Sequence, residues 1–306
     1  MLEATFLGTA ASVPSPERGL PALRVQHEGR RYLVDCGEGT QRQLMRSGIG
    51  FRRLDRVLLT HGHLDHILGL AGLAGTINLW RTTDRLTIHA GAAALQLAET
   101  LLLRVTWPDD PPRLALEFRR ILPGRILEEG RLRVTAFPVR HNAPDCFGFL
   151  FEEASHRPLL PDRLDALGVP AGPERSRLAR NEPVTLSDGR QVEPEQVLGP
   201  AKPGAKLAVI GDAEGVDDLV PFVRGADTLI VEATFRNSDA GKARARSHLT
   251  VGDAAHLAAA AGVRDLWLTH VSDRYRAADL EAEARTVFPR ARLARDFDRV
   301  RVLARG

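Results

Sequence analysis

The sequence predicts an α/β protein, because strand-like segments alternate with helical ones and polar residues gather where strands end. The apolar run 57–59 has the composition of a buried strand, whereas 92–103 is apolar at helical spacing and is expected to pack on a sheet. Histidines and aspartates stand directly after several predicted strands, which is where α/β folds place their chemistry. With 306 residues, 43% of them hydrophobic, the chain can bury a large core.

The first half of the chain is expected to supply most of the strands. A strand at 2–7 leads into a proline-containing loop, and strands at 22–27 and 31–35 form a hairpin. Gly37 and Gly39 permit a tight turn, after which Thr40 is predicted to cap a helix at 41–45. His89 is interpreted as structural. The pattern then predicts a helix at 67–80, the helix at 92–103, and strands at 86–89, 114–121, 132–137 and 147–151, with a Pro-Gly turn between 114–121 and 132–137.

The second half contains an insertion and the remaining strands. Residues from about 153 to 183 are rich in proline and arginine and show no strand-like alternation, although they lie between two core strands. Strands are predicted at 206–210, 229–231 and 266–268, and 242–246 is expected to be a basic loop. Thr250 can cap an alanine-rich helix that runs to Ala261. A helix at 279–287 and two short strands complete the chain.

The segment after strand 57–59 carries an unusual concentration of metal-binding side chains. His61, His63, Asp65 and His66 lie within six positions, and each imidazole in a core would need a hydrogen-bond partner. His61 and His63 can point one way from an extended segment, whereas Asp65 and His66 can point another. One segment can therefore serve two adjacent ions. The alternative is a solvated His-rich turn, which explains this pattern less well than a metal site does.

Composition limits the compartment and the partners. Two cysteines, Cys36 and Cys146, are too few for a disulfide framework. No apolar stretch reaches the ~20 residues that a membrane span needs. We therefore expect a cytoplasmic protein. The net charge of +3 is small, and the excess of arginine over lysine suits phosphate contacts without proving them.

Two motifs connect the chain to a known family. The segment Thr-His-Gly-His-Leu-Asp-His at 60–66 resembles the signature of the metallo-β-lactamase superfamily, and Asp-Cys-Gly-Glu-Gly-Thr-Gln at 35–41 resembles a block of ribonuclease Z, the tRNA 3′-end processing endonuclease. The resemblance implies a four-layered αββα metallo-β-lactamase sandwich over residues 1–306, with a flexible arm inserted at about 153–183.

The resemblance also implies a pair of metal ions. It assigns His61, His63 and His141 to one ion, Asp65, His66 and His270 to the other, and Asp212 to a position between them. The expected cofactors are two Zn²⁺ per subunit, with Mn²⁺ or Fe²⁺ as open alternatives. A loop histidine without a metal is the alternative interpretation of His141.

Catalytic and substrate-binding roles are implied by the same resemblance. Asp65 is expected to be the general base, and His248, oriented by Glu232, the acid that protonates the departing 3′ oxygen. A histidine that only caps a helix is the alternative for His248. The arm is expected to bind the tRNA body through its arginines. The alternative is that these arginines only form a solvent-exposed charged surface, which is more common for a run of charges. The candidate contacts are Gly172, Pro173, Arg175, Arg177 and Arg180.

Four residues depart from the family's blocks and keep more than one function open. They are Ala213, Glu214, Val231 and Leu249. The leading hypothesis is a homodimeric endonuclease that removes the 3′ trailer of precursor tRNA. The second is a related phosphodiesterase for a small or cyclic phosphodiester. The third is a metal-binding protein that binds RNA without turnover, and the near-complete ligand set argues against it.

Overall fold

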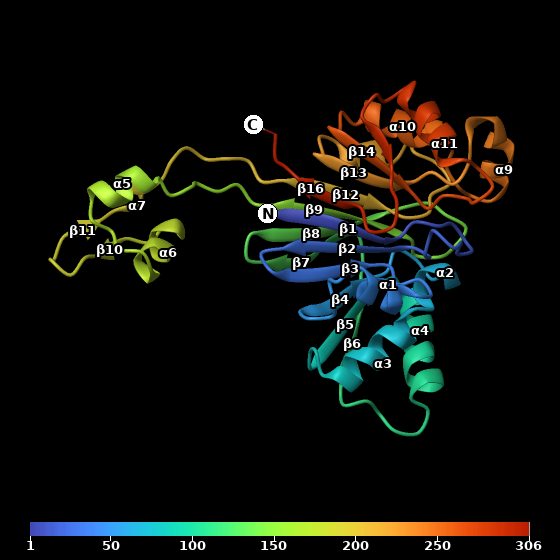
Figure 1. Cartoon of the computed structure of the whole chain (residues 1–306), viewed down its shortest axis with the longest axis horizontal. Coiled ribbons are helices and arrows are strands. Elements are labelled where there is room, and N and C mark those ends of the chain that lie inside the picture. Colours follow the sequence, from blue (N-terminus) through green and yellow to red (C-terminus); the bar gives the residue numbers. More distant parts are fainter. Residues whose placement is uncertain (306) are drawn as a thin grey trace. The chain divides into compact units, whose positions relative to one another are not determined.

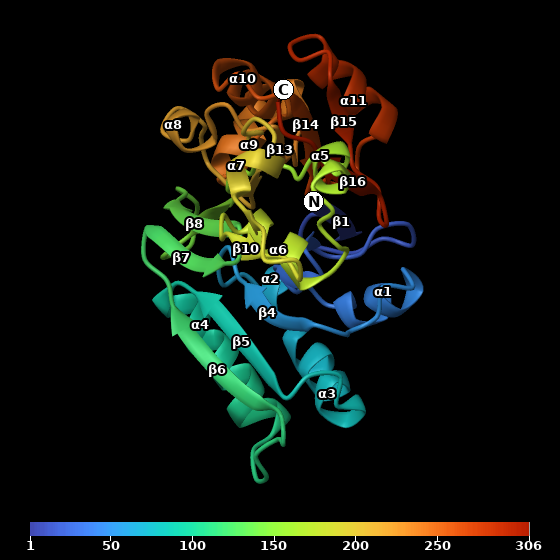
Figure 2. The same ribbon diagram turned by 90° about the vertical axis from the view of Figure 1, so that its left-hand side faces the viewer.

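The computed structural model describes residues 1–305, which fall into two compact units. The first comprises Met1–Glu152 and Ala205–Leu303, and the second comprises Glu153–Gly204 with the residues that follow Leu303. Figures 1 and 2 show the elements of both units. Within residues 1–305, no helix combines the length and the apolar character that crossing a bilayer requires.

The first sheet of the larger unit has the strand order β16-β1-β2-β3-β4-β5-β6. Strands β1 to β3 are antiparallel, and β3 to β6 run parallel to one another. Parallel strands place their carboxyl ends at one edge, so the segments that follow β4 and β5 emerge together. The strands are β1 (Leu2–Gly8), β2 (Ala22–His27), β3 (Arg30–Val34), β4 (Leu54–Leu58), β5 (Arg85–Ala90), β6 (Ala115–Arg120) and β16 (Arg299–Val302).

The second sheet has the order β15-β14-β13-β12-β9-β8-β7. Strands β12 to β15 are parallel, and β9 pairs antiparallel with β12. Its strands are β7 (Gly124–Glu129), β8 (Leu132–Pro138), β9 (Phe147–Glu153), β12 (Lys206–Ile210), β13 (Thr228–Glu232), β14 (Asp265–Thr269) and β15 (Ala291–Leu293).

The two sheets pack face to face, and helices cover their outer faces (Figure 1). Between the sheets, the ring of Phe6 lies 5.7 Å from that of Trp267, and Tyr32 lies 6.0 Å from Phe151. Helices α1 (Thr40–Arg46), α3 (Leu70–Trp80) and α4 (Ala92–Glu99) bury an apolar layer against the first sheet. Helices α10 (Val251–Ala260) and α11 (Ala277–Arg285) do the same on the second. The predicted αββα sandwich is confirmed.

Short elements complete the larger unit. They are α2 (Leu64–Ile67), α8 (Val220–Val223), α9 (Ala240–Ala245), the π-helical turn η1 (Thr100–Thr106) that continues α4, and the 3₁₀ turn η2 (Asn237–Asp239).

Three local predictions were wrong. Thr40 does not cap α1, because Gly39 takes the cap position at φ 80° while the Thr40 hydroxyl donates to the Gly37 carbonyl. Residues 124–129 form strand β7 paired with β8, although the Pro-Gly signal suggested only a turn. The expected basic loop at 242–246 falls largely within helix α9, in which Ala243 is buried. Alanines favour a helix there despite the flanking charges.

The predicted helical cap at Thr250 is confirmed. Its hydroxyl accepts a hydrogen bond from the backbone N–H of Asp253, and the Asp253 carboxylate accepts from the backbone N–H of Thr250. This reciprocal capping box fixes the start of α10.

The second unit has a small apolar core of its own. It contains α5 (Pro161–Ala166), α6 (Pro173–Ala179), β10 (Val184–Thr185), β11 (Gln191–Val192) and α7 (Pro194–Val197). Its core combines Leu164, Val169 and Leu178 with Val184, Leu186, Val192 and Val197. The unit therefore extends beyond the expected end at residue 183 to Gly204. Strands of two residues are too short to leave an alternating pattern in the sequence.

Candidate metal centre

The predicted ligands converge from four strand ends of the larger unit. The segment 60–66 follows β4, His141 lies just beyond β8, Asp212 follows β12 and His270 follows β14. The sheets are tied together at this edge, because the backbone N–H of Phe147 donates to the carbonyl of Thr60 at 2.8 Å. Residues that are distant in sequence thus meet in one place.

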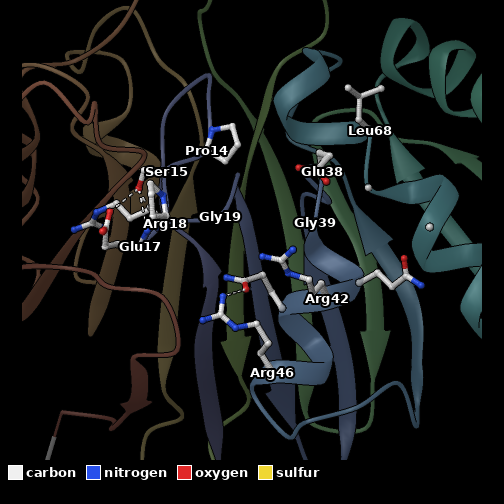
Figure 3. A pocket seen from close by; sticks show the side chains of 15 residues that line it. Pro14, Ser15, Glu17, Arg18, Gly19, Glu38, Gly39, Arg42, Arg46 and Leu68 are labelled. Atoms are coloured by element: carbon white, nitrogen blue, oxygen red, sulfur yellow. Dashed lines mark hydrogen bonds between the residues drawn. The ribbon is translucent and has the colours of Figure 1, made fainter.

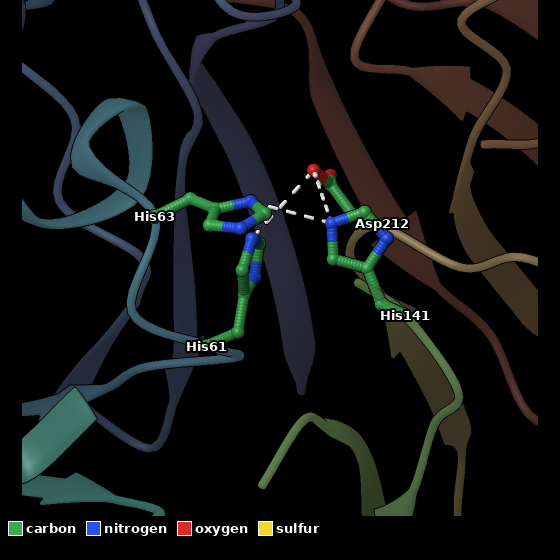
Figure 4. Close-up of side chains that lie close together, drawn as sticks. All are labelled: His61, His63, His141 and Asp212. Carbon is green, nitrogen blue, oxygen red and sulfur yellow. Dashed lines mark hydrogen bonds and ion pairs between the residues drawn. The ribbon is translucent and has the colours of Figure 1, made fainter. Parts of the chain in front are cut away.

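The first group consists of three histidines and one carboxylate. In Figure 4, the rings of His61, His63 and His141 and the carboxylate of Asp212 point toward one another. The Nε2 atoms of His61 and His141 each lie 3.6 Å from Asp212 Oδ2, and His141 Nε2 lies 3.3 Å from His63 Nδ1.

The second group lies against the other oxygen of the same carboxylate. His66 Nε2 and His270 Nε2 lie 3.4 and 3.2 Å from Asp212 Oδ1. The same two nitrogens are 3.7 and 3.5 Å from Asp65 Oδ2. Asp212 therefore faces both groups, with one oxygen toward each.

Polar groups outside the cluster hold four of the imidazoles by Nδ1. Thr60 Oγ1 lies 3.0 Å from His61 Nδ1, and Thr234 Oγ1 lies 3.0 Å from His270 Nδ1. The Nδ1 of His141 donates to the Ser247 carbonyl oxygen at 2.8 Å, which leaves its Nε2 with a lone pair.

Asp35 anchors the imidazole of His66. Its Oδ2 lies 2.8 Å from His66 Nδ1, and the same carboxylate accepts from the backbone N–H of Thr60 at 2.8 Å. Partners of this kind fix the ring orientation of metal-binding histidines. The sequence analysis did not assign this role to Asp35, and its place in the 35–41 block was the available signal.

The cluster fits divalent cations of the zinc type. Among residues 1–305, the buried atoms without a hydrogen-bond partner include His61 Nε2, His66 Nε2, His270 Nε2 and Asp212 Oδ1. Unpartnered buried polar atoms are costly and rare in folded proteins. Tetrahedral bonds of 2.0–2.1 Å place neighbouring ligand atoms about 3.3 Å apart, close to the separations found here. Imidazole and carboxylate form the donor set that zinc prefers.

Burial and mutual charge strongly perturb the cluster. Burial lowers the pKa of His61, and the neighbouring His66 adds to this effect. Burial opposes a charge on His66 as well, but Asp212 and Asp35 raise its pKa above the usual value. For Asp212, burial favours the neutral acid, yet His270 and His66 hold its pKa well below normal. Strong perturbation of this kind is typical of functional sites.

Two of the predicted catalytic residues form a hydrogen-bonded pair beside the cluster. His248 Nδ1 lies 2.9 Å from Glu232 Oε1, and the His248 ring is 5.2 Å from that of His141. The buried Glu232 also accepts from the backbone N–H of Ala213 and the hydroxyl of Thr234. Burial disfavours the charged imidazole, but Glu232 outweighs it and raises the pKa of His248 to about 9.

The third predicted catalytic residue, Asp65, lies at the start of α2. The backbone N–H of Ser12 donates to its Oδ2 at 3.0 Å. Burial favours its neutral acid, but His270 and His66 lower its pKa below the usual value. Asp65 is therefore an ionised carboxylate at the edge of the second group.

The predicted substrate contacts of the second unit are engaged within that unit. Gly172, at φ 146°, caps α6, and Pro173 occupies its first turn. Arg175 donates to the Val169 carbonyl and to Asp165, which makes it a brace of the loop 165–172. Arg177 and Arg180 both contact Glu182 and keep more than half of their side-chain surface exposed.

Three of the four departures from the family blocks are buried apolar residues. Ala213, Val231 and Leu249 belong to the core beneath α10. Glu214 is exposed, and its backbone N–H donates to the Arg140 carbonyl. The site geometry thus tolerates Val231 and Leu249 because both side chains point into the core.

A cavity of about 490 Å³ lies between the loop 14–19 and α1, and sequence reasoning did not identify it (Figure 3). Arg42 and Arg46, one helical turn apart, line it together with Arg18. Arg18 donates to the Thr9 hydroxyl and the Ala294 carbonyl, so it braces the loop. The spacing of Arg42 and Arg46 on one helix face was the available signal.

Known proteins resemble this chain over nearly its whole length. A model of the β-lactamase superfamily domain matches residues 30–159. Ribonuclease Z of Bradyrhizobium diazoefficiens is 50% identical over 300 residues, which cover 98% of this chain and 99% of that protein. Ribonuclease BN of Escherichia coli K12 is 37% identical over 305 residues, or 97% and 98% of the two chains. The crystal structure of the short form of human tRNase Z aligns with a TM-score of 0.68 at 27% identity, covering 98% and 99%.

Proposed function

This chain belongs to the ribonuclease Z family of the metallo-β-lactamase superfamily, and from that premise we propose that it removes the 3′ trailer of precursor tRNA. It is a metal-dependent endonuclease that hydrolyses phosphodiesters. One observation best supports removal of the trailer. His248 pairs with the buried Glu232 directly beside two groups of candidate metal ligands that share Asp212.

The seven convergent side chains would hold two zinc ions. His61, His63 and His141 would bind one ion, and Asp65, His66 and His270 the other, with Asp212 shared between them. When bound, such ions supply Lewis acidity that acidifies water and offsets the charge of the phosphate.

Asp65 and His248 would move the two protons of the reaction. A carboxylate oxygen of Asp65 accepts the proton of the attacking water while the Ser12 N–H fixes the side chain. Glu232 accepts a hydrogen bond from His248 Nδ1, which leaves the Nε2–H free to donate to the departing 3′ oxygen. The products are a tRNA with a 3′-hydroxyl and a trailer with a 5′-phosphate.

The unit at Glu153–Gly204 would serve as the arm that grips the tRNA body. Arg177 and Arg180 keep exposed guanidinium groups and can exchange Glu182 for backbone phosphates. Gly172, Pro173 and Arg175 would shape the loop that presents them.

Exposed apolar side chains support a homodimer. Leu64 on α2, Leu68 directly after α2, Leu97 on α4 and Val105 in η1 are exposed large apolar side chains. Leu97 lies next to the metal motif, because a Cβ at Gly62 would approach its Cδ1 to 3.0 Å. Where exposed apolar side chains gather into a patch, they mark a protein interface. We propose that the arm of one subunit holds the tRNA whose 3′ end enters the site of the other.

The two cysteines support a cytoplasmic location. Cys36 and Cys146 are both buried free thiols, which suits a reducing compartment.

Cleavage of a precursor tRNA by the zinc-loaded protein tests this proposal. The expected result is a single cut at the base of the trailer, leaving a 3′-hydroxyl, and its loss in Asp65→Ala. Hydrolysis of a small chromogenic phosphodiester without cleavage of the precursor would overturn the tRNA proposal and favour the small-phosphodiester alternative. Binding of the precursor without any hydrolysis would favour an RNA-binding protein.

A further inference from the structure

Two adjoining clefts lead away from the metal centre along one edge of the sandwich. The nearer cleft, of about 410 Å³, is lined by His141, Arg140 and Glu214 among others. The farther cleft, of about 650 Å³, lies where β5 and β6 face β7. The segment Arg120, Ile121, Leu122 and Pro123 borders both, so the two clefts meet there. This path starts at a predicted metal ligand.

The farther cleft is rich in arginine. Arg56, Arg85, Arg119, Arg120 and Arg125 line it, and Glu117 is the one carboxylate among the described residues of its lining. Arg85 and Arg119 share Glu117, at 3.5 and 3.1 Å. Among residues 1–305, the Arg120 side chain has no ion pair or hydrogen bond. Arg56 pairs with Asp55 and Glu129, and Arg125 pairs with Glu128, so Arg120 is the arginine of this cleft whose donors are all unused within residues 1–305.

The floor of the farther cleft contains a buried imidazole without a partner for one nitrogen. His89 is 7% exposed, and its Nε2 has no hydrogen-bond partner within residues 1–305. Burial lowers its pKa to about 4, and the charges of Arg56 and Arg119 add to this effect. The ring is thus neutral, and a shift of its side chain toward the cleft would let Nε2 hydrogen-bond to a sugar hydroxyl or a base.

We propose that these two clefts form a track that holds the single-stranded RNA trailer as it leaves the metal centre. This inference rests on the proposed function and adds a binding site for the part of the substrate that is removed. Arg120 and Leu122 lie where the clefts meet, so a phosphate and a base can be held there together. Leu122 is 63% exposed, and an apolar side chain in this position can pack against a base face.

The shape of the path favours the trailer over the rest of the precursor. The clefts follow one another along the sheet edge, and their volumes suit an extended strand rather than a helical turn of duplex. The acceptor stem on the tRNA side of the cut is a duplex, whereas the trailer beyond it has no complementary strand. Basic grooves with apolar contacts for bases are the usual means of holding single strands without sequence preference.

Trailer length provides the test. Precursors with a minimal trailer and with a trailer of about ten nucleotides are cleaved by the zinc-loaded protein and by Arg119→Ala/Arg120→Ala. The wild type should bind the long-trailer precursor more tightly than the short one. The double variant should raise KM about tenfold for the long trailer only, and its log KM should depend less on log salt by about 1.4, or 0.7 per lost phosphate contact.

A matched double variant controls for loss of surface charge. Arg299→Ala/Arg301→Ala removes two exposed arginines from β16, at the opposite edge of the same sheet, and should leave the length dependence unchanged. His89→Phe should reduce the long-trailer advantage while the thermal unfolding temperature reports any loss of packing. Equal KM values for both trailer lengths in the wild type, or an equal effect of both double variants, would overturn the track while leaving trailer cleavage intact. Failure to cleave either precursor would instead overturn the proposed function.

Discussion

The Nδ1 atom of His248 lies 2.9 Å from a carboxylate oxygen of Glu232, a residue with no exposed surface. Because Glu232 also accepts from the Ala213 N–H and the Thr234 hydroxyl, its carboxylate cannot rotate away from the imidazole without breaking two other hydrogen bonds. The imidazole is therefore held in one orientation through Nδ1, and its Nε2 makes no hydrogen bond within residues 1–305.

Replacement of His248 should expose its role as an acid. His248→Ala is expected to lower kcat for precursor tRNA about 10²- to 10⁴-fold with little change in KM, because the departing 3′ oxygen loses its proton donor. The loss of kcat should be smaller for a nitrophenyl phosphodiester, because nitrophenolate departs without needing a proton. Steady-state kinetics on both substrates, with the zinc content of the variant, make the measurement. An equal loss on both substrates would contradict the acid role.

Loss of the Asp212 carboxylate should impair metal loading as well as turnover. In wild type, saturating Zn²⁺ should raise the unfolding temperature, because it binds the native state and not the unfolded chain. Asp212→Ala is expected to bind fewer than two zinc ions per chain and to show a smaller thermal shift. Metal analysis after gel filtration and calorimetry test this. Two tightly bound ions in Asp212→Ala would show that its oxygens do not join the two groups.

Asp35 should act on the metal through His66. Asp35→Ala leaves His66 Nδ1 and the Thr60 N–H without their acceptor and is expected to weaken zinc affinity about 10- to 100-fold. Competition with a chromogenic chelator measures the change. Asp55→Ala, which alters an aspartate on the neighbouring strand β4, provides the control and should leave zinc affinity unchanged.

Removal of the second unit should separate cleavage of precursor tRNA from hydrolysis of a small phosphodiester. Glu152 and Lys206 are directly paired on β9 and β12, so a two-residue Asn-Gly turn can replace residues 153–205 and close a hairpin. This variant is expected to lose precursor cleavage but to keep hydrolysis of a chromogenic phosphodiester.

The shorter deletion of 153–183 provides the contrast. It would leave Val184, Val192 and Val197 without the apolar partners they have in the small core, so aggregation or a lower unfolding temperature is expected. If the longer deletion also abolished hydrolysis of the small substrate, the unit would be required by the site itself.

The sequence predicted those parts of the site that lie in compact motifs. The spacing of His61, His63, Asp65 and His66 within six positions carries its own chemical meaning, and the structure places them in two adjacent groups. The groups that hold the imidazoles, Asp35, Thr234 and the Ser247 carbonyl, are ordinary residues whose role depends on tertiary contacts. No local pattern distinguishes them.

Two errors in the fold have a similar origin. Strand β7 was missed because its partner β8 lies just beyond a glycine-containing turn, and a Pro-Gly signal marks a turn but does not reveal that a strand comes directly after it. The end of the second unit was placed too early because its last strands are two residues long and are stabilised by contacts with α5 and α6.

Hydroxyl, carbonyl and carboxylate groups of the protein itself hold the imidazoles. The large apolar cores on the two sheets include none of the seven candidate metal-binding residues. Small zinc domains acquire their shape from the ion, whereas this fold buries two large apolar clusters that can stabilise it independently of the ion. We therefore expect the relative supply of metals in the cell to decide which cation occupies the site, so that a change in supply retunes the enzyme without a change in its sequence.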